Sequence, residues 1–227
     1  MTSADDLLRE LRSHLHGVTT SYRSSSDPND VYEGYIFALV VTEALARGAQ
    51  VHYEDVHGNK TSRLVFRTTP GRIYSRAHPY THAVIQFGTA RPLEAHVGVQ
   101  VQGASGVLHE CDVLVLTTDE AELSRSAGVA PKTKGCVLAI ECKFYTSSLK
   151  LDLARSFQGL GADLGEKVRP TFVSNGSSTT IKRYLSHKKR DWEHDVLPGN
   201  TQVDGLRSKI REAFKVYLSR ADPTFSI

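Results

Sequence analysis

Two apolar stretches of this sequence carry charged residues at positions where a buried strand would place apolar ones. They are Glu110 and Asp112 in VLHECDVLVL (residues 107–116), and Glu141 and Lys143 in CVLAIECKFY (residues 136–145). Side chains alternate across a strand, so the two charges of each stretch point to the same face. Burying three acids and a lysine is costly unless they pair or bind a cation. The fold must therefore gather these charges or neutralise them with an ion.

The rest of the chain alternates between helical and strand patterns. Helices are expected at about residues 5–16, 28–47, 149–164, 178–187 and 203–220. Strands are expected at about residues 51–56, 61–68, 72–75, 81–87, 93–102, 107–116, 136–145 and 171–174. A polar loop is expected between the two charged strands, 107–116 and 136–145. Asp27 and Pro28 are typical of a helix start. The pattern predicts a mixed sheet with helices packed on it, of the α/β or α+β class.

Composition narrows the class of protein. The chain has 227 residues, 40% hydrophobic and 23% charged, which suits one globular domain without long linkers. No apolar run approaches the ~20 residues of a membrane span, so no membrane association is expected. Asp5, Asp6 and Glu10 make the N-terminus unlike a secretory signal. Three cysteines without a CxxC pair predict a reduced, cytoplasmic protein.

Basic residues are concentrated in the second half of the chain. Residues 1–113 hold 10 Lys and Arg against 12 Asp and Glu, whereas residues 114–227 hold 18 against 13. The densest basic run consists of Lys182, Arg183, Lys188, Lys189 and Arg190. Such a run is compatible with binding to nucleic-acid phosphates, and equally with a solvated helix face.

The charged strands contain the residue types of a magnesium site. Mg²⁺ prefers carboxylate and carbonyl oxygens. Asp112 and Glu141 on adjacent strands could supply carboxylates, and Cys142 a backbone carbonyl. Lys143 would then lie beside the attacking water, as metal-assisted phosphodiester hydrolysis requires. Glu33 lies on the edge of the apolar face of the helix expected at residues 28–47, where a carboxylate needs a partner.

A Glu-x-Lys sequence alone is weak, because about one match is expected by chance among 25 acids. A helix with an acid, followed by a strand with Asp and a strand with Glu-x-Lys, is a more specific pattern. This order of elements resembles the PD-(D/E)XK nuclease superfamily, whose fold is restriction-endonuclease-like. The matching stretches are YEGYIFALVVTEA (32–44), HECDVLVL (109–116) and AIECKFY (139–145), inside a resemblance covering about residues 28–175. The sequence departs from the motif at Cys111, where the family pattern has proline.

The resemblance implies metal binding by Asp112 and Glu141 and a catalytic role for Lys143. It also suggests Glu33 as the acid of the first core helix and Gln158 as a functional glutamine. It further implies a Mg²⁺-dependent endonuclease acting on DNA, with Mn²⁺ as a substitute, and a role in restriction or anti-phage defence. RNA is not excluded as substrate, and a homodimer would allow double-strand cleavage. Residues 1–227 are expected to form one nuclease-like domain, with its core at about 28–175 and a basic, helical extension at about 176–227.

Simpler interpretations of the same residues remain open from the sequence alone. Asp112 and Lys143 could form a structural ion pair, Glu33 could be a solvated acid near a helix start, and Gln158 could be an ordinary helix residue. Glu110 could pair with an arginine. Histidines 78, 82, 96 and 109 lack zinc-ligand spacing, and Cys111 and Cys142 are expected in the core. The alternative functions are a catalytically inactive nucleic-acid-binding module or a protein-interaction domain on the same fold.

Overall fold

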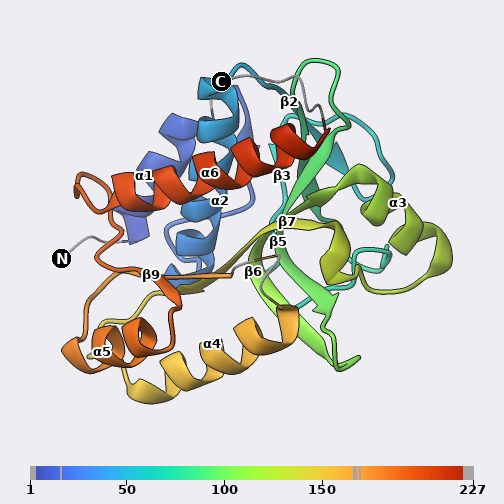
Figure 1. The fold of residues 1–227 in the computed structure, drawn as a ribbon. Helices are drawn as coiled ribbons and strands as arrows, with labels where there is room; N and C mark the ends of the chain where they lie inside the picture. The colour runs from blue at the N-terminus through green and yellow to red at the C-terminus, as the bar shows by residue number, and fades with distance from the viewer. Residues whose placement is uncertain (1–3, 16, 166–167, 169, 222–227) are drawn as a thin grey trace.

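A seven-stranded mixed sheet with helices on both faces forms the centre of the computed structural model, which describes residues 4–15, 17–165, 168 and 170–221 (Figure 1). In spatial order the strands are β2 (Gln50–Asp55), β4 (Thr81–Gln86), β5 (Leu93–Gln102), β6 (Leu108–Thr117), β7 (Cys136–Lys143), β8 (Thr171–Ser174) and β9 (Asp191–Glu193). Neighbours are antiparallel from β2 to β7, and β7, β8 and β9 are parallel. The predicted mixed α/β class is confirmed.

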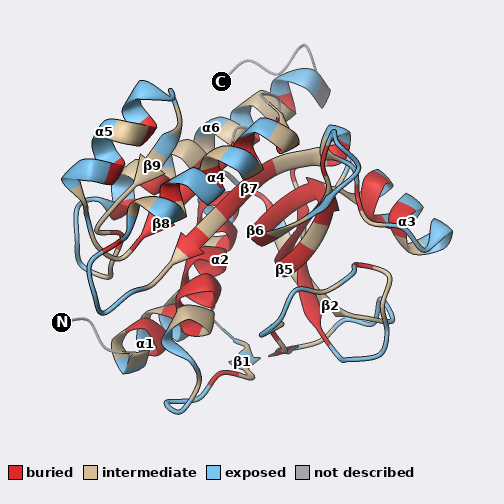
Figure 2. Cartoon of the chain, turned by 90° about the horizontal axis from the view of Figure 1, so that it is seen from below, coloured by how far each residue is buried: buried red, intermediate tan, exposed pale blue. Residues whose placement is uncertain are grey.

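Helix α2 (Pro28–Ala46) is the most deeply buried helix (Figure 2). It begins where the sequence predicts, because Asp27 Oδ1 accepts a hydrogen bond from Asn29 N at 2.8 Å and Pro28 occupies the first turn. It packs between the sheet, α1 (Ala4–His14) and α6 (Val203–Ala221). Apolar residues therefore surround the helix on nearly all sides, and a polar residue on it, such as Glu33, is forced into the interior.

The central strands alternate between two apolar layers. Val113, Val115 and Ile140 pack with the residues of α2 and α6, whereas Leu114, Leu116 and Ala139 pack on the opposite side with α3 (Thr118–Ala127) and α4 (Leu151–Leu164). Helix α5 (Thr179–His187) packs beside α4 near the β8–β9 edge of the sheet. Cys111 and Cys142 are buried in these layers as free thiols, which confirms their predicted place in the core.

The chain differs from the sequence prediction at several places, and β9 is a strand where none was predicted. Helix α3 replaces the expected polar loop: Thr117 caps it, Gly128 ends it, and it buries the small residues Ala121 and Ser124, which leave no apolar stripe in the sequence. The strand expected at 61–68 is reduced to β3 (Arg63–Leu64), which pairs in parallel with β1 (Thr19–Thr20). Residues 72–75 form no strand. A single bridge joins Gly71 to Val99 there.

Candidate functional site

The charged strands β6 and β7 separate where their charged residues begin. Their ladder ends with the pair Val113 and Ile140. Beyond it, the backbone N–H of Cys142 donates a hydrogen bond to Asp112 Oδ2 at 2.6 Å, so the carboxylate takes the place of a strand carbonyl. Asp112 is only 4% exposed. Its carboxylate is therefore fixed by the backbone of the neighbouring strand.

Lys143 joins the acids of both strands. Its Nζ lies 2.7 Å from Glu141 Oε1 and 3.3 Å from Asp112 Oδ2. Burial disfavours the charged ammonium, but attraction to Asp112 and Glu141 is stronger and raises the pKa of Lys143 above its ordinary value. Lys143 is thus a permanent cation at neutral pH. It can stabilise negative charge, and it cannot act as a general base.

Helix α2 adds a third carboxylate through a clamp that the sequence did not reveal. Asn29 Oδ1 accepts a hydrogen bond from Phe144 N at 3.2 Å, and its Nδ2 donates to Glu33 Oε1 at 2.8 Å. Asn29 therefore ties the start of α2 to the end of β7. Glu33 is 8% exposed, which rules out the solvated surface acid considered from the sequence.

The acids around this point are held without enough positive charge. Burial raises the pKa of Glu33 to about 9, and repulsion from Asp112 and Asp30 adds to the effect. Burial, followed by repulsion from Asp112 and Glu141, raises the pKa of Glu110 to about 7. The pKa of Glu141 is also raised, by burial and then by Asp112. No described residue forms an ion pair with Glu110, so the arginine partner considered from the sequence is not found among them.

A small cavity opens onto Glu33, Glu110 and Asp112, whereas Glu141 contacts Lys143 and is not among its lining residues. Its volume is about 190 Å³, and four of its lining residues are acids. The lining consists of Asn29, Asp30, Glu33, Arg67, Thr68, Thr69, Pro70, Gly98, Glu110, Asp112 and Lys143. We call it the carboxylate cavity. Carboxylate oxygens are the donors that Mg²⁺ prefers, and the raised pKa values show that the acids would gain from a divalent cation.

Residues 67–70 form one wall of the carboxylate cavity, and Gly71 anchors this segment to β5. Gly71 N donates to Gly98 O at 2.9 Å, and Gln100 N donates to Gly71 O at 3.0 Å. Gly98 has a φ of +63°, and a Cβ added there would lie 3.3 Å from Arg67 Cβ. The missing side chain of Gly98 thus lets this segment approach the strand that borders Asp112.

Gly98→Ala is expected to destabilise the fold by about 1–3 kcal/mol, because alanine is strained at positive φ and would crowd Arg67. Gly106→Ala is the matched control, since Gly106 also has positive φ, at +86°, but its added Cβ would meet nothing closer than 3.9 Å. Urea unfolding of both variants measures the difference. If both variants lowered the free energy of unfolding equally, crowding of Arg67 at Gly98 would make no contribution to the loss.

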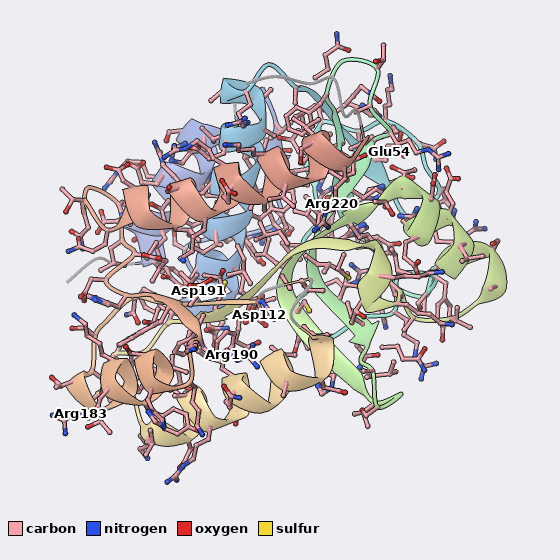
Figure 3. The ribbon with its side chains drawn as sticks, viewed as in Figure 1. Glu54, Asp112, Arg183, Arg190, Asp191 and Arg220 are labelled. Atoms are coloured by element: carbon pink, nitrogen blue, oxygen red, sulfur yellow. The ribbon has the colours of Figure 1, made fainter. Side chains whose placement is uncertain are left out.

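The remaining predicted site residues lie elsewhere. Lys182, Arg183, Lys188 and Lys189 are exposed on and after α5, and Figure 3 shows Arg183 at the outer side of this helix, away from Asp112. Arg190 Nε donates to Gln158 Oε1 at 3.0 Å. Neither Gln158 nor any residue of the basic run lines the carboxylate cavity. The structure therefore brings together Glu33, Asp112 and Lys143 with Glu110 and Glu141, but not Gln158.

A second buried polar cluster contains two of the histidines that lack zinc-ligand spacing in the sequence, His82 and His96. The β4–β5 register, in which Ala83 pairs with Ala95, places His82 and His96 side by side, their rings stacked at 4.7 Å. Together with Glu94 they form a group whose side chains could hold a metal ion. However, Arg125 donates to both oxygens of Glu94, at 2.9 and 2.5 Å. That guanidinium supplies the charge Glu94 needs, and burial lowers the pKa of His82 to about 3 and of His96 to about 4, so both rings are neutral.

Comparison of the chain with protein-family models, with curated proteins and with solved structures finds no match. None of the described helices combines the length and the apolar character needed to cross a bilayer. The chemistry of the site is therefore to be inferred from its own residues.

Proposed function

We propose that this chain is a metal-dependent nuclease that hydrolyses phosphodiester bonds in DNA, built on a restriction-endonuclease-like core. The observation that carries the proposal is the meeting of Asp112 and Glu141, from adjacent strands, at Lys143 Nζ beside a cavity lined by further acids. An acid on α2, an acid on β6 and Glu-x-Lys on β7 lie in contacting elements. Their order along the chain is the one expected from the resemblance.

The residues present fit a magnesium ion. Asp112 and Glu141 would hold it, with the carbonyl of Cys142 as a third ligand, and Mn²⁺ would be accepted by the same oxygen donors. When bound, the ion supplies the positive charge that the acids lack and polarises a phosphoryl oxygen. The surplus of carboxylates over cations around the cavity supports this assignment over a purely structural Asp112–Lys143 pair.

The side chains of the chain have separable roles in this proposal. Asp112 is held in place by Cys142 N–H, and Lys143 stabilises the negative charge that develops on the phosphate. Glu110 has a pKa of about 7, closer to neutrality than the value of about 9 for Glu33. The Glu110 carboxylate lines the carboxylate cavity beside Asp112, where it would be placed to accept the proton of the attacking water.

The exposed basic run of α5 would contact DNA phosphates outside the cavity. Lys182, Arg183, Lys188 and Lys189 are exposed and free to approach a backbone, and contacts of this kind give affinity without sequence preference. Arg190 is half-buried and donates to Gln158. RNA phosphates would satisfy the same contacts. We assign the basic run to affinity and the carboxylate cavity to chemistry, because the run does not line that cavity.

Glu141→Gln is expected to reduce plasmid cleavage in Mg²⁺ or Mn²⁺ by roughly tenfold or more, because one ligand loses its charge. The wild-type protein should be inactive in EDTA. Glu122→Gln, at an exposed position of α3, is the matched control and should cleave as the wild type does. DNA binding without any cleavage, unaffected by Glu141→Gln and by metal, would instead indicate the alternative function of a nucleic-acid-binding module.

A further inference from the structure

A second, larger cavity adjoins the carboxylate cavity. Its volume is about 720 Å³, and it shares Arg67, Thr68, Thr69 and Pro70 with its neighbour. The other lining residues are Phe66, Gly71, Arg72, Ser75, His78, Pro79, Tyr80 and Gln100. We call it the Arg67 pocket. The described residues that line it include two arginines and a histidine and no acid, whereas four acids line the carboxylate cavity. The two cavities therefore differ in their acidic residues and share a common wall.

The Arg67 side chain is held at this common wall. Its guanidinium carbon lies 3.5 Å from the centroid of the Tyr80 ring, as in a cation–π pair. On the other side it passes against Gly71, where an added Cβ would overlap with Arg67 Nε and Cδ. One terminal nitrogen donates weakly to Val97 O, at 3.4 Å. Tyr80 and Gly71 thus fix the guanidinium in a single position.

The other terminal nitrogen of Arg67, Nη2, is buried and has no hydrogen-bond partner among the described residues. A buried unpaired donor on a charged group is costly, so it indicates a missing acceptor. Burial lowers the pKa of Arg67, but an arginine remains charged at neutral pH. The acceptor that best satisfies a fixed guanidinium is an anionic oxygen of a carboxylate or phosphate. The described lining of the Arg67 pocket offers no acid, and a ligand phosphate in the pocket would supply such an oxygen.

Arg72 and Gln100 extend the polar lining away from Arg67. Arg72 is exposed, lines the pocket and donates from Nη1 to Tyr74 Oη at 2.7 Å. Gln100 follows Gly98 on β5 and offers an amide, which can donate and accept. The pocket therefore presents positive charge for a phosphate and neutral hydrogen-bonding groups for a sugar or base.

We propose that the Arg67 pocket binds the nucleotide that adjoins the cleaved bond, with its phosphate on Arg67 and Arg72. The inference rests on the proposed function, because the carboxylate cavity next to the pocket is where the reacting phosphate is placed. Acids would hold a metal on one side of the shared wall, and arginines would hold the next phosphate of the same strand on the other side.

Binding of a fluorescein-labelled 12-nucleotide DNA single strand, and of the matching duplex, tests the proposal by anisotropy in EDTA. Arg67→Ala with Arg72→Ala is expected to weaken binding by at least about tenfold for one or both probes. The slope of log affinity against log salt should also become shallower, by roughly 0.7 for each single-strand phosphate that the variant no longer neutralises. Arg155→Ala is the matched control, because Arg155 is exposed on α4 and lines neither cavity.

Gly71→Ala provides a second variant that keeps every charge. It should displace the Arg67 side chain and weaken binding in the same direction, with thermal unfolding as the check that the fold survives. Wild-type affinity and salt slope in the double variant would overturn the inference, as would wild-type protein that binds neither probe. Failure of the proposed function gives a different result, because the wild-type protein would then cleave no DNA with Mg²⁺ or Mn²⁺, whatever the arginine variants do.

Discussion

Lys143→Ala is expected to slow Mg²⁺-dependent plasmid cleavage by at least about 100-fold, the typical cost of removing a fixed group that stabilises developing charge. Lys143 Nζ is held at 2.7 Å from Glu141 and 3.3 Å from Asp112, so its charge has a fixed position at the site. Its raised pKa keeps it charged during the reaction. Initial rates of supercoiled plasmid cleavage, measured at saturating metal, give the comparison.

Two further variants show whether charge or position matters at this site. Lys143→Arg keeps the charge but presents a planar fork in place of a compact ammonium, and we expect a rate between those of the wild type and the alanine variant. Lys150→Ala removes an exposed lysine just before α4 and should leave the rate unchanged. Cleavage by Lys143→Ala at the wild-type rate would show that Lys143 is only the structural partner of Asp112.

The part of the site that lies on β6 and β7 follows from the sequence because strand geometry is periodic. Glu110 with Asp112 and Glu141 with Lys143 are two residues apart, so each pair shares a face once the strands form. The strands themselves are marked by apolar residues, and the bounds of β5 and β8 agree with the prediction. Local pattern and local geometry therefore suffice for the acids and the lysine.

The rest of the site depends on contacts between distant segments, which no local pattern encodes. Asn29 reaches Phe144 across 115 positions of the sequence, and Arg67 reaches the carbonyl of Val97 across 30. Gly98 stands between Val97 and Val99 in an alternating strand pattern. The reason for a glycine there is the contact with residues 67–71, which the sequence does not show. Alternation in the sequence shows which residues share a face, and only the tertiary structure shows what covers that face.

The same reasoning explains why the basic run in the sequence does not identify the cationic residues that line the two cavities. Lys182 and Arg183 are clustered in sequence because they share the exposed side of one helix. Arg67 and Arg72, by contrast, are dispersed among polar residues and line one pocket because the chain bends at Thr68 and Thr69. Charge density along the chain therefore marks a surface, whereas charge next to the carboxylates requires the fold.

Glu33→Gln is expected to stabilise the metal-free protein while it weakens cleavage. The pKa of Glu33 is about 9 in the folded chain and near 4.5 in the unfolded chain. The folded state thus binds the proton more tightly, so the stability linked to this group is complete below pH 4.5 and is lost as the pH rises through 9. Glutamine cannot ionise and keeps an oxygen for the hydrogen bond from Asn29 Nδ2. At pH 8 these two pKa values correspond to a gain of up to about 5 kcal/mol, or a melting temperature higher by up to roughly 10–20 °C.

Thermal unfolding in EDTA between pH 5 and pH 9 measures this gain, with Glu122→Gln on α3 as the control. The wild-type melting temperature should fall more steeply with pH than that of Glu33→Gln, and the two should converge toward pH 5. Adding Mg²⁺ should raise the wild-type melting temperature more than that of the variant, because the cation relieves the repulsion that the substitution has already removed. Parallel curves for the two proteins would mean that neither burial nor the neighbouring acids raise the pKa of Glu33 above its ordinary value. Such a result would remove the argument that the acids of the carboxylate cavity lack positive charge and would be stabilised by a metal ion.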